Sequence, residues 1–380
     1  MRLCWLVGLA LLMLGTASFA SEDHVASPKG EVVWQYQDPR QRPYPFLEAF
    51  RLLPDGDLVV GVEEDEDEYS IQRRGSDGRL LWRTKLSWEP DEWNAGIVPD
   101  GKAALWVTDG RGHARALAAD GALQKAAGHG RVLWSPGVSI RDDSELETFA
   151  ALSQTGDGKS GKSWRFPHDT YSTWGWELSN RADGGVVAIV ATRSPSFGVN
   201  LYGRGQHLDP QEHSWLVSLS QAGKPRWMKD LPAGEAFEGV AARGETELIV
   251  AHRLSEGHMS IEVRNAGDGH LERHEESSLG KPPEIQGSCN LHTTFHEHAA
   301  GTLVVRTCQY VASASEMGVG AGPVHAAYSM VYRLTPDIRL QDIGLGWLSG
   351  DKPQVTANGG KLLLRDGNRI VAYSLMTADH

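Results

Sequence analysis

Short apolar runs alternate with glycine-containing turns along most of the chain. One unit recurs: an apolar run, a short turn that contains glycine, and a second apolar run. Runs rich in valine, leucine and isoleucine are typical of buried β-strands, and glycine adopts the positive φ that tight antiparallel turns require. The pattern predicts seven β-hairpins, with turn glycines at Gly56, Gly101, Gly137, Gly184, Gly244, Gly301 and Gly359.

A third strand follows each predicted hairpin, and a fourth follows most of them. In the first unit these are "YSIQRRGSDG" and "RLLWRTKL". Repeated units of four antiparallel strands are typical of a β-propeller. We therefore predict an all-β fold, a single β-propeller of seven four-stranded blades over residues 21–380, with the third unit the weakest. A row of small β domains or a solenoid is the alternative.

The two ends of the chain carry complementary parts of one unit. The last unit stops after its third strand, "RIVAYSLM", whereas the N-terminal "GEVVWQYQD" reads as a fourth strand with no unit of its own. Pairing residues 31–38 with residues 369–375 would complete the last blade and leave no unpaired edge at the seam. The sequence thus predicts a ring closed by its own N-terminal strand.

The first twenty residues have the features of a secretory signal. Arg2 precedes a short apolar run from Leu3 to Leu14, and small residues stand at Ser18 and Ala20. This arrangement predicts a signal peptide over residues 1–20 and an exported protein, periplasmic or secreted. No later stretch is apolar for long enough to form a membrane-spanning helix.

The net charge narrows the choice of partners. It is -12 at pH 7, and acidic residues are spread along the chain. Nucleic acids and anionic membrane surfaces are poor partners for such a protein. We expect a monomer whose partner is a protein or a small polar ligand in the cell envelope.

Two cysteines remain after the predicted signal, Cys289 and Cys308, and they flank the hairpin that turns at Gly301. Counting outward from the turn places them nearly opposite each other on paired strands, at a separation that a disulfide can span. In an oxidising compartment we expect the bond to form. It would hold the base of the long connection that follows Cys308.

The phrases "GSDGRLLWRTKL", "SLSQAGKPRWMKDL" and "GEVVWQYQD" resemble the repeat of the quinoprotein-dehydrogenase-like propellers. The resemblance implies that a strand with tryptophan, which follows a turn glycine, docks one blade on the next. Such repeats occur in enzymes that bind pyrroloquinoline quinone and in propellers without a cofactor, including a bacterial outer-membrane assembly scaffold. The chain lacks the adjacent cysteine pair of several quinone enzymes, so we expect no cofactor, with pyrroloquinoline quinone and calcium as the alternative.

A propeller of this topology has its short turns on one face and its longer connections on the other. The second face is predicted to carry the acidic run Glu63–Glu68 and two long loops, Ser194–His213 and Tyr310–Tyr328. Insertions confined to one face of a repeat protein are commonly binding sites, although loops tolerated without function are the alternative. The candidate side chains in these loops are His207, Asp209, His213 and His325.

The mouth of the central channel on the same face is a second candidate site. Its polar groups suit a small polar ligand or a cation, and a mouth filled only by water is the alternative. Three histidines, His292, His296 and His298, share one face of a predicted strand, but positions four apart are too distant to share one ion, so we predict no metal site. An ion shared by His296 and His298, the second of which lies at the turn, is the alternative. The mouth residues are Glu48, Asn94, Arg131, Trp174, Glu238 and His292.

The sequence contains no nucleophile elbow, phosphate-binding glycine loop or zinc-protease motif. The predicted function is therefore that of an exported non-catalytic binding or scaffold module, acting through the face that bears loops 194–213 and 310–328. A quinoprotein-type oxidoreductase or a hydrolase that uses the central channel is the alternative.

Overall fold

The computed structural model shows an all-β protein. Within the described ranges no residue is helical, and no helix has the length and apolar character to cross a membrane. The described residues are 31–37, 47–53, 55–65, 68–86, 97–99, 105–108, 114–123, 133–136, 140–141, 145–146, 149–152, 162–164, 172–193, 213–232, 235–255, 257–280, 288–298, 301–311, 325–356, 359–367 and 369–375.

Antiparallel sheets whose strands pair in chain order make up most of the structure. One sheet contains β2 (Leu47–Leu52), β3 (Leu58–Asp65), β4 (Glu68–Arg74) and β5 (Leu80–Leu86). Another contains β14 (Ser172–Asn180), β15 (Val186–Arg193), β16 (His213–Leu219) and β17 (Pro225–Asp230). The next contains β18 (Ala236–Arg243), β19 (Glu247–Ser255), β20 (His258–Asn265) and β21 (Leu271–Ser278). The following sheet contains β22 (Ser288–His298), β23 (Gly301–Val311), β24 (His325–Leu334), β25 (Leu340–Asp342) and β26 (Leu348–Ser349).

Smaller sheets lie between the β2 and β14 sheets in the chain. One contains β6 (Ile97–Pro99), β7 (Leu105–Thr108) and β8 (Ala114–Leu117). A second contains β9 (Leu133–Pro136), β12 (Phe149–Leu152) and β13 (Lys162–Trp164), and a separate pair is formed by β10 (Ile140–Arg141) and β11 (Glu145–Leu146). The sequence unit predicted to be weakest thus corresponds to the three described strands β9, β12 and β13.

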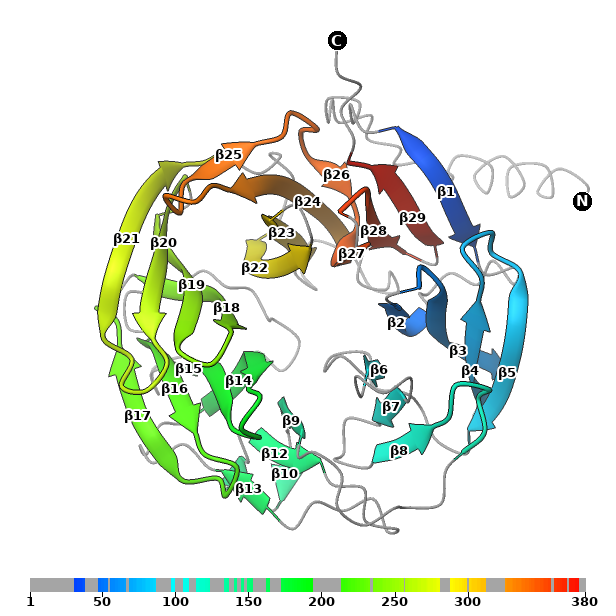
Figure 1. Ribbon diagram of the computed structural model, residues 1–380, viewed down its shortest axis with the longest axis horizontal. Helices are drawn as coiled ribbons and strands as arrows, with labels where there is room; N and C mark the ends of the chain where they lie inside the picture. Colours follow the sequence, from blue (N-terminus) through cyan, green and yellow to red (C-terminus); the bar gives the residue numbers. More distant parts are fainter. Residues whose placement is uncertain are drawn as a thin grey trace, which may run out of the picture.

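The N-terminal strand completes the last sheet, as the sequence predicts. This sheet contains β27 (Asp351–Val355), β28 (Lys361–Asp366), β29 (Arg369–Ser374) and β1 (Val32–Gln37). Gln35 pairs with Val371 and Tyr36 with Ile370, so β1 runs antiparallel to β29. Figure 1 shows the two strands side by side and the sheets following one another around a ring.

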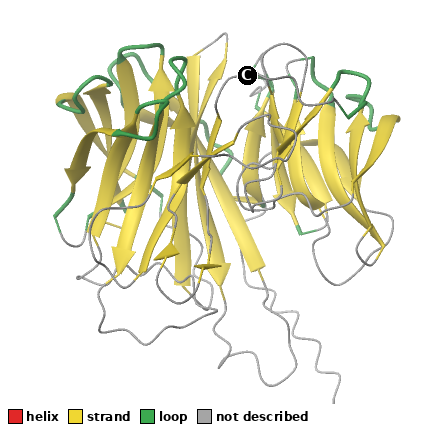
Figure 2. Cartoon of the chain, turned by 90° about the horizontal axis from the view of Figure 1, so that it is seen from below, coloured by secondary structure: helices red, strands yellow, loops and turns green. Residues whose placement is uncertain are grey.

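Apart from the β10–β11 pair, each sheet has one terminal strand toward the centre of the ring and the other toward the rim (Figure 1). The strands toward the centre are called the inner strands below; they are β2, β6, β9, β14, β18, β22 and β27. Seen from the side, the strands run from one end of the ring to the other, and most of the described turns gather at one end (Figure 2). We call this the turn end. The inner strands begin at the opposite end.

The glycines predicted to turn the hairpins have the expected backbone wherever the structure describes them. Positive φ is confirmed at Gly56, Gly184, Gly244, Gly301 and Gly359. Gly101 and Gly137 lie outside the described residues.

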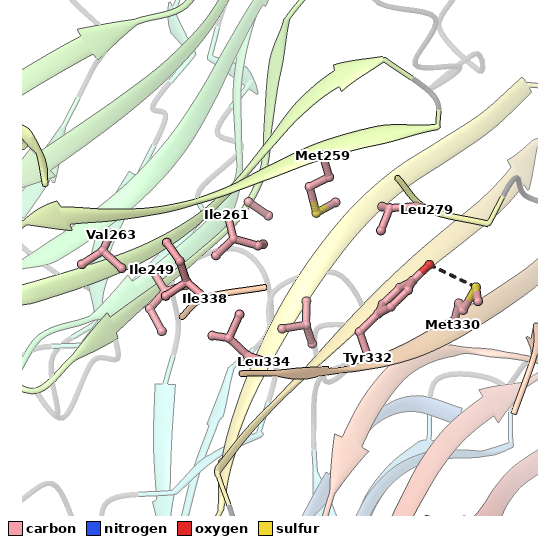
Figure 3. Packing of buried hydrophobic residues seen from close by; sticks show 11 residues of the cluster. Ile249, Met259, Ile261, Val263, Leu279, Met330, Tyr332, Leu334 and Ile338 are labelled. Carbon is pink, nitrogen blue, oxygen red and sulfur yellow. Dashed lines mark hydrogen bonds between the residues drawn. The ribbon is translucent and has the colours of Figure 1, made fainter. Parts of the chain in front are cut away.

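The hydrophobic core lies between neighbouring sheets. Met259 and Ile261 of β20 face Tyr332 and Leu334 of β24, and the Tyr332 hydroxyl lies 3.1 Å from Met330 Sδ (Figure 3). Each apolar side chain buried in this way stabilises the fold by about 1.5–3 kcal/mol. Because each sheet has neighbours on both faces, its middle strands are apolar on both faces, which explains the continuous apolar runs in the sequence.

Tryptophans near the rim attach one sheet to the next, as the family resemblance implies. Trp82 Nε1 of β5 donates to Ala119 O, 2.9 Å away, in the turn after β8. Trp227 Nε1 of β17 donates to Ala266 O at 3.3 Å, and its ring lies against Gly269. A Cβ on Gly269 would lie 2.7 Å from that ring, so only glycine permits this approach.

Two connections are shorter than the sequence predicts. β23 continues to Val311 and β24 begins at His325, so strands replace both ends of the predicted loop Tyr310–Tyr328. The acidic run Glu63–Glu68 is mostly strand, because Glu63 pairs with Tyr69 and Asp65 with Glu68. A strand ladder is held by backbone hydrogen bonds, and these do not depend on the charge of the side chains.

Candidate binding site at the inner strands

A buried carboxylate fork joins the β18 and β22 sheets. Glu238 is the extra residue of a β-bulge in β18 and is fully buried. Its two carboxylate oxygens accept from Arg306 Nη2 and Nε of β23, both at 3.1 Å. Arg253 Nε lies 3.4 Å from Glu238 Oε1, and the Thr293 hydroxyl donates to Oε2 at 3.2 Å.

Charge pairing outweighs burial at this fork. Burial alone would raise the pKa of Glu238, but Arg306 and Arg253 hold that pKa below its ordinary value. The next residue, Gly239, allows the two inner strands to approach, since a Cβ there would lie 1.9 Å from Thr293 O. Glu238 is therefore ionised, fixed in position and occupied by its partners.

A similar fork lies within the β27 sheet, and a hydrogen bond from Gln309 links it to the β22 sheet. Asp351 begins β27, and Arg365 of β28 donates to its two carboxylate oxygens at 3.0 and 3.1 Å. Gln309 Nε2 of β23 donates to Asp351 Oδ2 at 2.9 Å. Burial would raise the pKa of Asp351, but Arg365 outweighs it and the pKa lies below its ordinary value.

His292 lies near both forks. The half-buried side chain projects from β22 on the face opposite that of Thr293. Burial lowers the pKa of His292, the charges of Asp351 and Glu238 oppose this, and Lys352 adds to the lowering. The imidazole is therefore neutral at pH 7 and can donate one hydrogen bond and accept another.

Lys352 lies in the irregular start of β27, between the register pairs formed by Asp351 and Gln354. Its φ of 49° is in the left-handed region, which is uncommon for a residue other than glycine and costs on the order of 1 kcal/mol. The Lys352 ammonium acts on the pKa of both His292 and Asp351, so it lies close to this pair.

Arg51 and His296 form a second group of polar side chains, nearer the turn end. Both are half-buried, Arg51 on β2 and His296 on β22. Burial lowers the pKa of Arg51. Burial, followed by the charges of Arg51 and His298, lowers the pKa of His296 to about 3. His296 Nε2 lies 2.9 Å from the Thr294 hydroxyl, whereas Arg51 forms no hydrogen bond or ion pair in the structure as described.

Glu177 is an isolated carboxyl group on another inner strand, β14. It is half-buried and, like Arg51, makes no hydrogen bond or ion pair in the described structure. Burial raises the pKa of Glu177 to about 8. Most Glu177 side chains are therefore neutral carboxylic acids at pH 7.

A separate buried network surrounds His252 of β19. Its Nδ1 lies 2.9 Å from Glu262 Oε1, and its Nε2 lies 2.8 Å from Glu235 Oε2. Burial lowers the pKa of His252, but the two carboxylates outweigh it and raise that pKa above its ordinary value. The ring also contacts Phe237, with centroids 5.7 Å apart. This network is a pH-sensitive attachment within the β18 sheet.

Of the predicted mouth residues, the structure brings Glu238 and His292 together. Glu48 and Trp174 lie on the inner strands β2 and β14, but their side chains are outside the description. Asn94 and Arg131 lie outside the described residues. The binding role of all six residues stays a prediction.

The four candidate residues of the two long loops lie either at the first position of a strand or outside the described residues. His213 begins β16 and His325 begins β24, whereas His207 and Asp209 are not described. Among described residues, no group of three or more histidine, cysteine, aspartate or glutamate side chains is arranged to hold a metal ion.

The predicted disulfide stays a prediction. Cys308 is fully buried in β23 and pairs with Leu291, while Cys289 pairs with Tyr310. Cys289 is therefore two residues along β22 from Leu291, the residue directly opposite Cys308.

Sequence reasoning missed Arg51, Glu177, Asp351 and Lys352. One available signal was a charged residue inside an apolar run, as at Glu177 in "WGWELS" and Arg306 in "LVVRTC". Charged residues are rarely buried without a partner, so such positions mark buried pairs or functional groups.

Comparison with known proteins shows the fold and leaves the family open. No family model matches the sequence, and no curated protein matches it. A chain in the crystal structure of a mitotic checkpoint complex is similar over 92% of this chain and 93% of its own, with 12% identity and a TM-score of 0.52. This likeness, together with the ring of antiparallel sheets, shows that the fold is a β-propeller.

Other solved structures show weaker likeness. The quinohemoprotein alcohol dehydrogenase from Comamonas testosteroni is similar over 89% of this chain and 66% of its own, with 12% identity and a TM-score of 0.43. The Pan2 WD40 domain of Neurospora crassa is similar over 92% of this chain and 97% of its own, with 8% identity and a TM-score of 0.33.

Proposed function

We propose that this protein is an exported, monomeric, closed propeller of seven blades, which acts as a non-catalytic binding module. Its partner is a protein or a small polar ligand of the cell envelope. One observation carries the proposal: Glu238 and Asp351, the buried carboxylates of the inner strands, are each held by an arginine fork. Fixed, ionised carboxylates of this kind make a rigid frame and are poorly suited to proton transfer.

The contact surface of the proposal is the end of the ring where the inner strands begin. Glu238 and Asp351 lie near the starts of β18 and β27, and His292 lies in the first half of β22, before the turn at Gly301. The long connections leave from the same end, because β15 ends at Arg193 opposite Ser172, the first residue of β14. A rigid frame beside two long loops is a common arrangement for binding sites.

Closure and the blade count rest on strand pairing. The β1–β29 ladder joins the two ends of the chain, and the shorter β6 and β9 sheets occupy the places of the second and third blades. In the proposal each of these is a complete blade.

A quinone cofactor fits the inner strands poorly. A calcium ion needs several oxygen ligands, many of them carboxylate. Among the described side chains, Glu238 and Asp351 already accept from arginines, which leaves few such oxygens. Adding pyrroloquinoline quinone and calcium to the purified protein should give neither an absorbance change nor dye reduction. Calcium-dependent dye reduction would instead favour the oxidoreductase.

Export and the disulfide have direct tests. Sequencing of the mature N-terminus from fractionated cells should start at Ser21, and a start at Met1 would contradict export. Non-reducing mass spectrometry should find one bond between Cys289 and Cys308, and two free thiols would contradict it.

The binding face is tested by capture from cell envelopes. Deletion of residues 196–211 should abolish capture of the partner that the wild-type protein retains. The matched control is Arg243→Ala with Glu245→Ala, two exposed substitutions at the turn end, which should leave capture unchanged. Equal capture by the deletion variant would refute the assignment of the face, provided that its thermal unfolding midpoint matches that of the wild type.

A further inference from the structure

His252 of β19 lies between two carboxylates, one at each nitrogen of its ring. Nδ1 is 2.9 Å from Glu262 Oε1, and Nε2 is 2.8 Å from Glu235 Oε2. An ionised carboxylate only accepts hydrogen bonds, so both contacts are hydrogen bonds only when each ring nitrogen carries a proton. A neutral imidazole has one N–H and can hold one carboxylate. Loss of a proton from the ring must therefore break one of the two contacts.

The other partners of the two carboxylates decide which contact breaks. Glu262 is buried, and its second oxygen accepts from Arg264 Nε at 2.6 Å. The side chain of Glu235 is 33% exposed and has His252 as its one partner among the described residues. A neutral imidazole therefore keeps its proton on Nδ1, toward Glu262, and presents the lone pair of Nε2 to the carboxylate of Glu235.

Glu235 belongs to the connection between β17 and β18, which leads from the rim of one sheet to the inner strand of the next (Figure 1). Two backbone contacts also hold this connection. Leu231 N donates to Ser214 O at 3.0 Å, and Phe237 N donates to Ser214 Oγ at 3.2 Å. Among the described residues 231, 232 and 235, Glu235 alone forms a side-chain hydrogen bond to the β18 sheet. This attachment therefore depends on the proton at Nε2 of His252.

Other charged groups face the same side of the β18 sheet without pairing with His252. Within the described part of the chain, His252 forms hydrogen bonds or ion pairs with Glu235 and Glu262 alone. His274, which pairs with Glu262 across β20 and β21, is exposed and is a second histidine that titrates nearby. Besides Arg264, the charged or titratable side chains on this side are Glu177 of β14, Lys229 of β17, and His274 and Glu276 of β21.

We propose that His252 is a pH-dependent latch on the connection between β17 and β18. The imidazolium holds Glu235 against the β18 sheet. Release of the Nε2 proton to solvent replaces this attraction by repulsion between a lone pair and a carboxylate, so Glu235 turns toward solvent and the connection loosens.

The direction of the pH effect follows from the two carboxylates. Burial lowers the pKa of His252, but Glu262 and Glu235 outweigh it and raise that pKa above its ordinary 6.5. The stability contributed by the latch is therefore fully present below pH 6.5 and is lost as the pH rises through the raised pKa. The latch is closed at pH 6 and open at high pH.

The connection lies at the end of the ring where the inner strands begin, which is the proposed contact surface. Capture of the partner should therefore differ between the closed and the open latch. This consequence rests on the proposed function, whereas the latch itself does not.

The test is hydrogen exchange of the fragment with residues 231–237, measured by mass spectrometry on the full-length mature protein at pH 6 and pH 9. Each rate is divided by the intrinsic rate at the same pH to give a protection factor. In the wild type this factor should fall about tenfold at pH 9, as expected for loss of one charge-assisted hydrogen bond, while that of β23 stays within about twofold. An unchanged factor, or an equal fall in both fragments, would overturn the proposal.

Variants separate the latch from other titrating groups. Glu235→Ala should give low protection at both pH values. Glu235→Gln should give high protection at both, because an amide can accept from a protonated Nε2 and donate to a deprotonated one. His274→Gln should keep the wild-type fall. A fall that persists in either Glu235 variant, or that disappears in His274→Gln, would overturn the proposal.

This result is separable from the proposed binding face. Deletion of residues 196–211 removes neither Glu235 nor His252, so the deletion variant should keep the pH-dependent exchange. That exchange without partner capture would refute the face alone, and capture without the pH-dependent exchange would refute the latch alone.

Discussion

Substituting Glu177 by glutamine tests whether the inner strands hold an uncompensated acid. Its pKa is raised from an ordinary 4.5 to about 8, so the folded state holds a proton that the unfolded state releases. At about 1.4 kcal/mol per pH unit, this difference costs the folded state about 5 kcal/mol at pH 8 and above. The side chain is half-buried, and the water that still reaches it reduces this cost, so we expect about 2–3 kcal/mol.

The sign of the effect follows from proton linkage. Because the folded state binds more protons than the unfolded state between pH 4.5 and about 8, wild-type stability falls as the pH rises through that window. Glutamine removes the titration and keeps the shape. Glu177→Gln should therefore match the wild type near pH 4 and exceed it progressively up to pH 8.

Urea denaturation at pH 4.5, 6, 7 and 8 measures the difference, with the slopes compared to verify that both proteins unfold to the same extent. Glu272→Gln on the rim strand β21 controls for the loss of one negative charge. A Glu177→Gln variant that is less stable than the wild type at pH 8 would show that Glu177 has a favourable partner. A difference that is the same at every pH would show that titration of Glu177 does not cause it, and either result would refute the reasoning.

The remaining predictions concern stability. Arg306→Met removes the two hydrogen bonds of the fork and leaves buried Glu238 with Arg253 and the Thr293 hydroxyl alone. The free energy of unfolding should fall by about 3 kcal/mol in urea, and adding Glu238→Gln should recover part of the loss; no loss would show that the fork is dispensable. Gly269→Ala places a Cβ 2.7 Å from the indole ring of Trp227 and should lower the free energy of unfolding by about 2–3 kcal/mol. Gly244→Ala has a similar positive φ but open space around it, and should lower the free energy of unfolding by about 1 kcal/mol. Equal losses in the two variants would contradict the contact between Trp227 and Gly269. His252→Gln should destabilise the protein most below pH 6.5, because the raised pKa of His252 adds stability that is lost as the pH rises through that pKa. Unfolding midpoints of the variant and the wild type at pH 6 and pH 9 measure the difference, and a loss of stability that grows toward pH 9 would refute the prediction.

The fold was predictable because its causes are local. The hairpin turns have glycines such as Gly56 and Gly184 where the backbone takes a positive φ, and the apolar runs beside these turns are buried between two neighbouring sheets. The pairing of β1 with β29 was predictable from an unfinished last unit and a surplus first strand. The residues at which the connections begin and end were not predictable, because a strand pairing continues through polar residues such as Glu63 as long as the backbone remains paired.

The candidate site was predictable only in part. Glu238 could be placed because it stands near the start of its inner strand, whereas His292 lies further along β22 than expected, because that strand begins at Ser288. Arg306 could not be assigned to Glu238, because the residues lie 68 positions apart and only the packing of two sheets brings them together. Arg51 and Glu177 were missed because a hydropathy pattern treats charged residues as exposed.

The distribution of these contacts gives the rim and the centre of the ring different physical characters. Near the rim, tryptophans such as Trp227 attach neighbouring sheets through a ring contact and one hydrogen bond, which respond little to pH or salt. Near the centre, attachment depends on ionised pairs such as Glu238 with Arg306, which are strong only while buried and complete. A protein built in this way can hold unpaired groups such as Arg51 among its inner strands, because apolar packing between the sheets and the rim contacts maintain the ring independently of them.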